Sequence, residues 1–116
     1  MEEREFESVR LLCKVLVGTG KYRRARELLA GLVKAAPGDA WIERNLVLSL
    51  LRLGEFEDAL PAAAGLAGRA SGADRIPALF FHAYALWGCG RTEESRRVVE
   101  EYSRELSRRR GGDRDA

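Results

Sequence analysis

The sequence predicts an all-α fold made of three copies of one helix-turn-helix unit. Its first support is a short block with a glycine, an aromatic residue or threonine two positions later, and a small residue five positions later. The three copies are Gly20, Tyr22 and Ala25; Gly54, Phe56 and Ala59; and Gly90, Thr92 and Ser95. Their spacing, 34 and then 36 residues, is in the range of helical repeat proteins. Stacked pairs bury a continuous core that one pair cannot form alone.

The repeat boundaries follow from aligning the three blocks. The repeats then cover residues 6–39, 40–73 and 76–109. Because they use nearly all of the 116 residues, we expect a single domain over residues 1–109.

Each repeat is expected to supply two helices. Apolar residues at helical spacing predict helices over about residues 4–18, 22–35, 40–53, 56–69, 76–88 and 92–109. The glycine of each block is expected to end the first helix by taking up a left-handed conformation. Residues 110–116 have no apolar side chain before Ala116, so we expect them to form a disordered tail.

The packing positions of the repeats hold apolar or small residues. In the first repeat they are Val9, Leu12, Cys13, Leu16, Ala25, Leu29, Leu32 and Pro37. Small side chains at some of these positions allow the two helices of a pair to approach closely. The third repeat is the most degenerate, and its packing positions include Leu79, His82, Ala83, Leu86, Ser95, Val99 and Tyr102.

Composition narrows the functional classes. A formal net charge of +2 argues against nucleic acid or an acidic membrane as the main partner. The longest uncharged run, residues 76–90, is shorter than the roughly 20 apolar residues of a membrane helix. The acidic N-terminus is unlike a secretory signal. We therefore expect a cytoplasmic protein with no membrane span, in which Cys13 and Cys89 are reduced.

No enzyme active site is expected from the residues present. The chain has one histidine, His82, at a packing position, where a core role is commoner than catalysis. Gly18 and Gly20 are not followed by the GK[ST] sequence of a phosphate-binding loop. The two cysteines are too far apart in the sequence to match a metal-ligand spacing. We expect no catalytic residue, no metal and no cofactor.

A second set of positions, on the first helix of each repeat, is predicted to line a concave groove. Its members are Leu11, Lys14, Trp41, Arg44, Asn45, Leu48, Leu51, Phe80, Phe81, Tyr84 and Trp87. Tyr84 and Trp87 recur at helical spacing on a side separate from the packing stripe, and an exposed apolar patch there would mark an interaction site. Such a groove suits an amphipathic helix of a partner protein.

Over residues 6–107 the chain resembles the tetratricopeptide repeat family, whose helix pairs stack into a right-handed α-solenoid. Three segments are similar to the needle-subunit chaperone of bacterial type III secretion: LVGTG at residues 16–20, SLLRLGEFEDAL at residues 49–60 and ALWGCGRTEES at residues 85–95. RARELLAGLVKAAP at residues 24–37 also resembles a sister chaperone of that system, which holds an early exported component.

The resemblance implies a chaperone that masks the amphipathic helix of an export substrate until secretion. Such a protein often has a small helical co-chaperone packed alongside. Two alternatives stay open: a general scaffold of this repeat family whose apolar groove forms a homodimer, and a regulatory adaptor unrelated to secretion.

Overall fold

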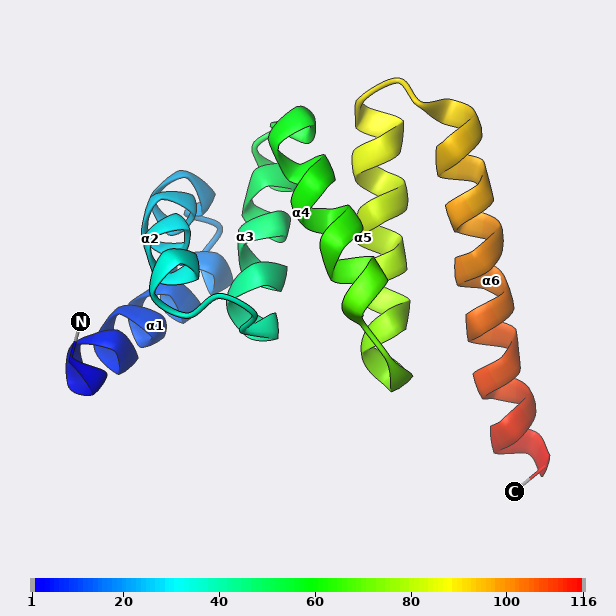
Figure 1. The fold of residues 1–116 in the computed structure, drawn as a ribbon, viewed down its shortest axis with the longest axis horizontal. Helices are drawn as coiled ribbons and strands as arrows, with labels where there is room; N and C mark the ends of the chain where they lie inside the picture. The colour runs from blue at the N-terminus through cyan, green and yellow to red at the C-terminus, as the bar shows by residue number, and fades with distance from the viewer. Residues whose placement is uncertain (1, 116) are drawn as a thin grey trace. The chain divides into compact units, whose positions relative to one another are not determined.

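The structure is a computed structural model that describes residues 2–115, with side chains described as far as residue 111. Its α-helices are α1 (Glu3–Gly18), α2 (Tyr22–Ala35), α3 (Ala40–Arg52), α4 (Phe56–Arg69), α5 (Arg75–Gly88) and α6 (Thr92–Asp115) (Figure 1). A short 3₁₀ turn, η1 (Gly72–Asp74), precedes α5. No strand occurs within residues 2–115. The fold is all-α and consists of three helix-turn-helix pairs, as the sequence predicts.

The helix boundaries agree with the sequence to within one residue, except at the end of α6. We expected this helix to end at Arg109, but it continues to Asp115. Residues 110–115 are therefore helical where a disordered tail was expected, and Ala116 lies outside the described residues. Glu105 explains part of the extension, because it accepts a hydrogen bond of 2.6 Å from Arg108. This pair one turn apart stabilises the helix, and no proline interrupts it afterwards.

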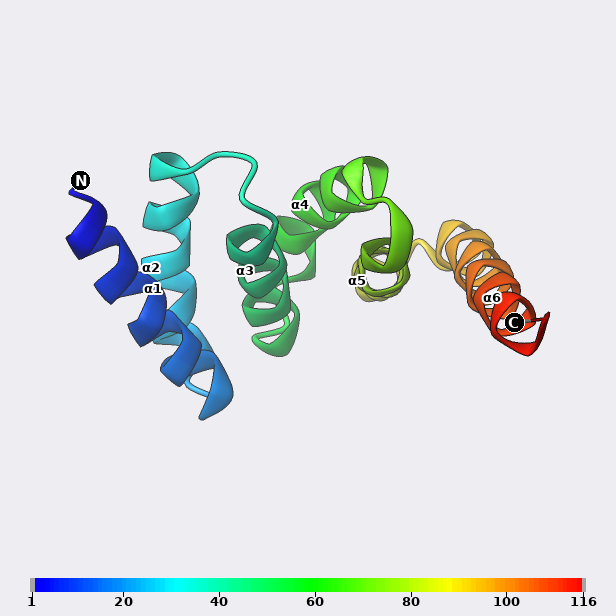
Figure 2. The same ribbon diagram turned by 90° about the horizontal axis from the view of Figure 1, so that it is seen from below.

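The chain forms two compact units, residues 1–55 and residues 56–116. In the first unit α1 packs on α2, and α2 packs on α3. In the second unit α4 packs on α5, and α5 packs on α6. Figure 2 shows the helices of each unit from a second direction. That residues 1–109 act as a single domain stays a prediction.

The three repeat glycines end their helices in the way that the sequence predicts. Gly20, Gly54 and Gly90 have φ angles of 76°, 74° and 77°. In the first turn, the N–H of Lys21 donates to the carbonyl of Leu16 at 2.8 Å, and the N–H of Gly20 donates to Val17 at 3.1 Å. The other two turns repeat this pair of bonds. The left-handed residue thereby satisfies carbonyl groups that the end of a helix leaves free.

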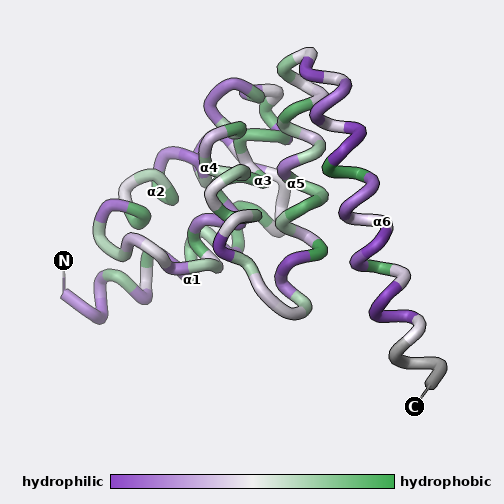
Figure 3. Tube along the Cα trace, turned by 45° about the vertical axis from the view of Figure 1, so that its right-hand side comes forward, coloured by the Kyte–Doolittle hydropathy of each residue, from purple (hydrophilic) through white to green (hydrophobic). Residues whose placement is uncertain are grey.

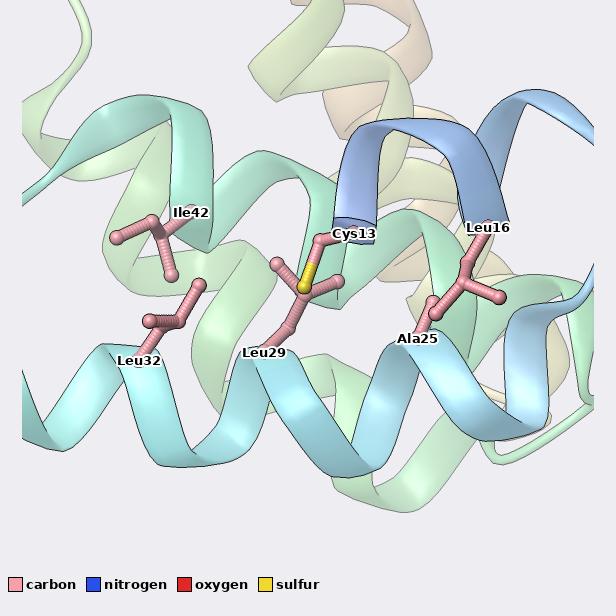
Figure 4. Packing of buried hydrophobic residues seen from close by; sticks show 6 residues of the cluster. All are labelled: Cys13, Leu16, Ala25, Leu29, Leu32 and Ile42. Carbon is pink, nitrogen blue, oxygen red and sulfur yellow. The ribbon is translucent and has the colours of Figure 1, made fainter. Parts of the chain in front are cut away.

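The core of the first unit forms where three helices meet. Cys13 and Leu16 of α1 face Ala25, Leu29 and Leu32 of α2, and Ile42 of α3 completes the cluster (Figure 4). Cys13, Ala25 and Leu29 are fully buried. The small side chains allow α1 and α2 to approach closely, and α3 then covers the outer side of the pair.

The core of the second unit is built around α5. Leu66 and Ala67 of α4 pack against Ala78 and Leu79 of α5. One turn further along α5, the hydroxyl of Ser95 in α6 donates to the carbonyl of Ala83 at 2.8 Å. The ion pair between Arg75 and Glu101 adds a polar link between α5 and α6.

The lone histidine has the environment of a structural residue. His82 is half-buried in α5, and burial lowers the pKa of its imidazole below the ordinary value. The side chain is therefore neutral at pH 7.

Within residues 2–115, none of the helices combines the length and the apolar character needed to cross a membrane.

Asp39 joins the start of α3 to α1. Its side chain accepts a hydrogen bond from the N–H of Ile42 at 3.1 Å, which makes it the N-cap of α3, and a second one from Arg10 at 3.0 Å. Desolvation acts to raise the pKa of Asp39. The hydrogen bonds from Ile42 and Arg10, together with the charge of Arg10, outweigh it, so the pKa lies below its ordinary value.

Gly88, the last residue of α5, lies against the ring of Phe56 at the start of α4. A Cβ atom at position 88 would overlap this ring. The backbone of α5 and an aromatic side chain of α4 are therefore in direct contact, and only glycine leaves enough room between them.

We predict that Asp39→Ala lowers the free energy of unfolding at pH 7 by about 1 kcal/mol, because it removes the N-cap. Asp39→Asn keeps a capping oxygen and loses only the charge, so its cost should be smaller. A depressed pKa stabilises the fold above the unfolded value of about 3.9, and this contribution is lost as pH falls through the folded pKa. Urea unfolding at a series of pH values below 7 should show the difference between wild type and Asp39→Asn shrink as the pH falls.

We also predict opposite effects for two glycine substitutions in the second unit. Gly88→Ala should lower the free energy of unfolding by about 1–3 kcal/mol, because the new methyl group displaces the Phe56 ring. Gly68→Ala is the matched control, since nothing lies within 4 Å of its Cβ position. It should be neutral or stabilising by up to about 1 kcal/mol. Equal effects of the two changes in urea unfolding would contradict the proposed contact.

Candidate functional site

Three aromatic side chains of α5 are exposed along one side of the helix. Phe80 is 49% exposed, Tyr84 40% and Trp87 61%. Their spacing of four and then three residues places them on one helical face. On the other faces of α5, Ala78, Leu79, Ala83, Ala85 and Leu86 are buried. The aromatic stripe is therefore separate from the packing face of α5, as the sequence predicts.

This stripe forms one wall of a groove between α5 and α6. The groove has a volume of about 410 Å³ and is lined by Phe80, Ala83, Tyr84, Trp87, Ser95 and Val99; we call it the aromatic groove. Val99 of α6 is 46% exposed and faces it from the opposite wall. Figure 3 shows the contrast between α5, which is largely hydrophobic, and α6, which is largely hydrophilic. The groove is thus an apolar surface beside a charged helix.

The rings of the aromatic groove support one another. Phe56 stacks on Tyr84 with 5.7 Å between ring centroids, and it meets Trp87 edge-on at 6.3 Å. Tyr84 lies 6.0 Å from Trp87 and 6.1 Å from Phe80, in both cases edge to face. Such contacts restrict the rotation of side chains that are exposed to water. A ligand therefore meets a surface that is already ordered, which reduces the entropy lost on binding.

Phe81 was predicted to line the groove, but the structure places it elsewhere. Its side chain is partly buried and packs against the core cluster of Leu66, Ala67, Ala78 and Leu79. It also contacts the ring of Phe80 at 6.1 Å. Phe81 therefore holds α5 in the core of the second unit, and it is not among the residues that line the groove.

The other predicted groove residues belong to the first unit. On α3, Trp41, Arg44, Asn45 and Leu48 are half-buried. Leu51 is only 5% exposed, so it has little surface to offer a ligand.

Two contacts fix the environment of Trp41. Its ring lies under the guanidinium of Arg10 at 4.8 Å, and its carbonyl accepts a hydrogen bond of 2.8 Å from the side chain of Asn45. The indole and the amide are therefore committed to contacts within the first unit.

On α1, Leu11 and Lys14 are both exposed. Leu11, which is 62% exposed, joins Leu12 and Val15 in a second apolar surface. We call these three residues the α1 face. The structure therefore separates the predicted set into an aromatic stripe, a half-buried α3 cluster and part of the α1 face.

Three residues that line the aromatic groove, Ala83, Ser95 and Val99, were assigned to packing by the sequence. Phe56, which contacts the rings of Tyr84 and Trp87, was assigned only to the repeated block. The position of Val99 in the third repeat matches that of Leu29 in the first, which is fully buried in the unit where α3 packs on α2. The signal that could have identified Val99 was its packing position in the third repeat, because within the described residues only α5 packs extensively on α6.

The chemistry of the aromatic groove is that of a binding surface. Its lining contains one serine hydroxyl, which already donates to Ala83, and otherwise apolar or aromatic side chains. Among the described residues, no group of three or more His, Cys, Asp or Glu side chains is placed to hold a metal ion. The groove offers apolar area and ring edges, which is what a protein helix needs from a receptor.

Comparison with protein families matches residues 40–64 and 76–101 to the tetratricopeptide repeat. No curated protein matches the chain. The matched segments fall in the second and third predicted repeats, and they include the stripe of α5 that forms the aromatic groove. Repeats of this family act as scaffolds for binding other proteins. The helical repeat fold agrees with this similarity to the tetratricopeptide repeat.

Proposed function

We propose that the protein binds an amphipathic helix of another protein in the aromatic groove. The observation that carries this proposal is the exposure of Phe80, Tyr84, Trp87 and Val99 around one apolar depression. Large apolar surfaces of this kind mark interaction sites on soluble domains. An amphipathic helix covers such a surface with residues spaced three and four apart.

The free energy expected for binding a helix in the aromatic groove fits a reversible complex. Burying four large apolar anchors contributes about 6–12 kcal/mol before costs. Ordering the ligand and losing its free motion offset several kcal/mol of this. The net affinity is therefore expected to be between micromolar and nanomolar. The exposed wall at Trp87 should contribute most, because aromatic anchors dominate such interfaces.

The partner that we propose is an export substrate of bacterial type III secretion, such as its needle subunit. The resemblance of residues 16–20, 49–60 and 85–95 to needle-subunit chaperones supports this assignment. The third of these segments contains Trp87, and it continues through the turn into the start of α6. The protein would act in the cytoplasm and mask a helix that otherwise polymerises. A general scaffold of the same repeat family agrees equally with the family match.

We predict that Trp87→Glu weakens binding of a needle-subunit helix at least about 30-fold, the effect of losing an anchor worth 2 kcal/mol. The helix would come from the organism that encodes this chain, with affinity measured by calorimetry. Ala30→Glu is the matched control, because Ala30 is exposed but lies on α2. It should bind like wild type.

Circular dichroism and urea unfolding would establish that both variants keep the fold. Unchanged binding by a folded Trp87→Glu variant would contradict the assignment of the groove. A wild-type protein that ignores the needle subunit, yet forms a stable dimer through the groove, would instead favour the homodimeric scaffold.

A further inference from the structure

The α1 face is a second uncovered apolar surface, distant in sequence from the aromatic groove. Leu11 is 62% exposed, Leu12 44% and Val15 54%. Leu11 and Val15 are one turn apart, and Leu12 lies between them on the same side of α1. An apolar stripe on the outside of a helix is the usual mark of a surface that packs against another element.

Comparison of α1 with the equivalent helix of the second repeat, α3, indicates what the α1 face can contact. α3 occupies in the second repeat the position that α1 occupies in the first, 34 residues earlier. Leu46, the counterpart of Leu12, packs against the core cluster of α1 and α2. Ser49, the counterpart of Val15, is fully buried. Leu12 of the α1 face therefore corresponds to a residue by which α3 covers a helix pair, whereas the counterparts of Trp41 and Ile42 at that contact are Glu7 and Ser8.

The aromatic groove corresponds to the side of the α1–α2 pair that α3 covers in the first unit. Its residues Ser95 and Val99 are the counterparts of Ala25 and Leu29, which are fully buried in the unit where α3 covers the α1–α2 pair. Val99 is instead 46% exposed. Within the described residues, the α5–α6 pair has no helix in the place that α3 takes on the α1–α2 pair.

Charge also matches between the two surfaces. In the first unit Ile42, near the start of α3, packs in one cluster with Leu32, near the end of α2 (Figure 4). The same placement on the α5–α6 pair would bring the start of α1 to the end of α6. The start of α1 is acidic on balance, with Glu2, Glu3, Glu5 and Glu7 beside Arg4. The end of α6 is basic on balance, with Arg104, Arg108, Arg109, Arg110 and Arg114 beside Glu105, Asp113 and Asp115.

We propose that the protein self-associates head to tail, with α1 of a second copy seated in the aromatic groove. The α1 face supplies Leu12 and Val15 to the wall formed by Trp87 and Val99. A dimer formed in this way leaves the groove free on one copy and the α1 face free on the other. The contact is therefore heterologous and can add further copies in a row. The inference does not require the proposed function, but a partner helix and α1 would compete for the same groove.

The test uses two substitutions that each block one half of the contact. Val15→Lys places a charge on the α1 face, and Val99→Lys places one in the groove. In sedimentation velocity between 5 and about 500 µM, wild type should grow in mass with concentration. Each variant alone should stay monomeric, with association at least about 30-fold weaker, as expected when an interface anchor is lost.

An equimolar mixture of the two variants gives the decisive result. Val15→Lys keeps an intact groove and Val99→Lys keeps an intact α1 face, so the mixture should form a one-to-one dimer that cannot extend. Ala30→Lys adds the same charge at an exposed position of α2 and should assemble like wild type. Raising the salt concentration should weaken assembly, because the acidic and basic ends are exposed.

Three outcomes would overturn the proposal. They are a wild type that is monomeric throughout, a Val15→Lys variant that still assembles, or two monomeric variants that stay monomeric when mixed. Trp87→Lys provides a second groove variant if Val99→Lys fails to fold by circular dichroism. Needle-subunit binding by Val15→Lys reports separately on the proposed function, because that variant leaves the groove intact.

Discussion

The structure depends on one constraint: a pair of these helices has an apolar outer side that another helix must cover. In the first unit α3 meets this need, and Leu29 beneath it is fully buried. In the second unit the matching residue, Val99, is half exposed at the edge of an aromatic groove. Burying apolar area is the dominant favourable term in folding and in association. The same constraint therefore produces a core in one unit and an exposed apolar groove in the other.

Most of the fold could be predicted from the sequence, because the signals that set the helix boundaries are local. Gly20, Gly54 and Gly90 end three helices through bonds that reach back no more than five residues. These turns fixed the boundaries of five helices to within one residue. The end of α6 could not be predicted in the same way. The pairing of Glu105 with Arg108 contributes to it, and the composition of a charged tail does not predict such a pair.

The candidate site was less predictable, because exposure depends on which neighbour covers a residue. The spacing of Phe80, Tyr84 and Trp87 identified the aromatic stripe. The same pattern could not separate Phe80 from Phe81, since adjacent residues on a helix point only about 100° apart. Phe81 turned out to hold the core, while Val99 turned out to line the groove. Both results follow from how whole helices pack. The repeat pattern gives only the usual role of each position, not its role in this particular repeat.

The order of helix contacts has a consequence for how the chain unfolds. Within each unit, every extensive contact joins helices that are consecutive in the sequence. Chains of this kind behave as one-dimensional systems, in which each pair has its own stability and gains more from its neighbour. Hydrogen exchange would then follow position along the array, with helices that lack a neighbour on one side opening first. A helix that enters the aromatic groove supplies such a neighbour, and its effect spreads inward from α6.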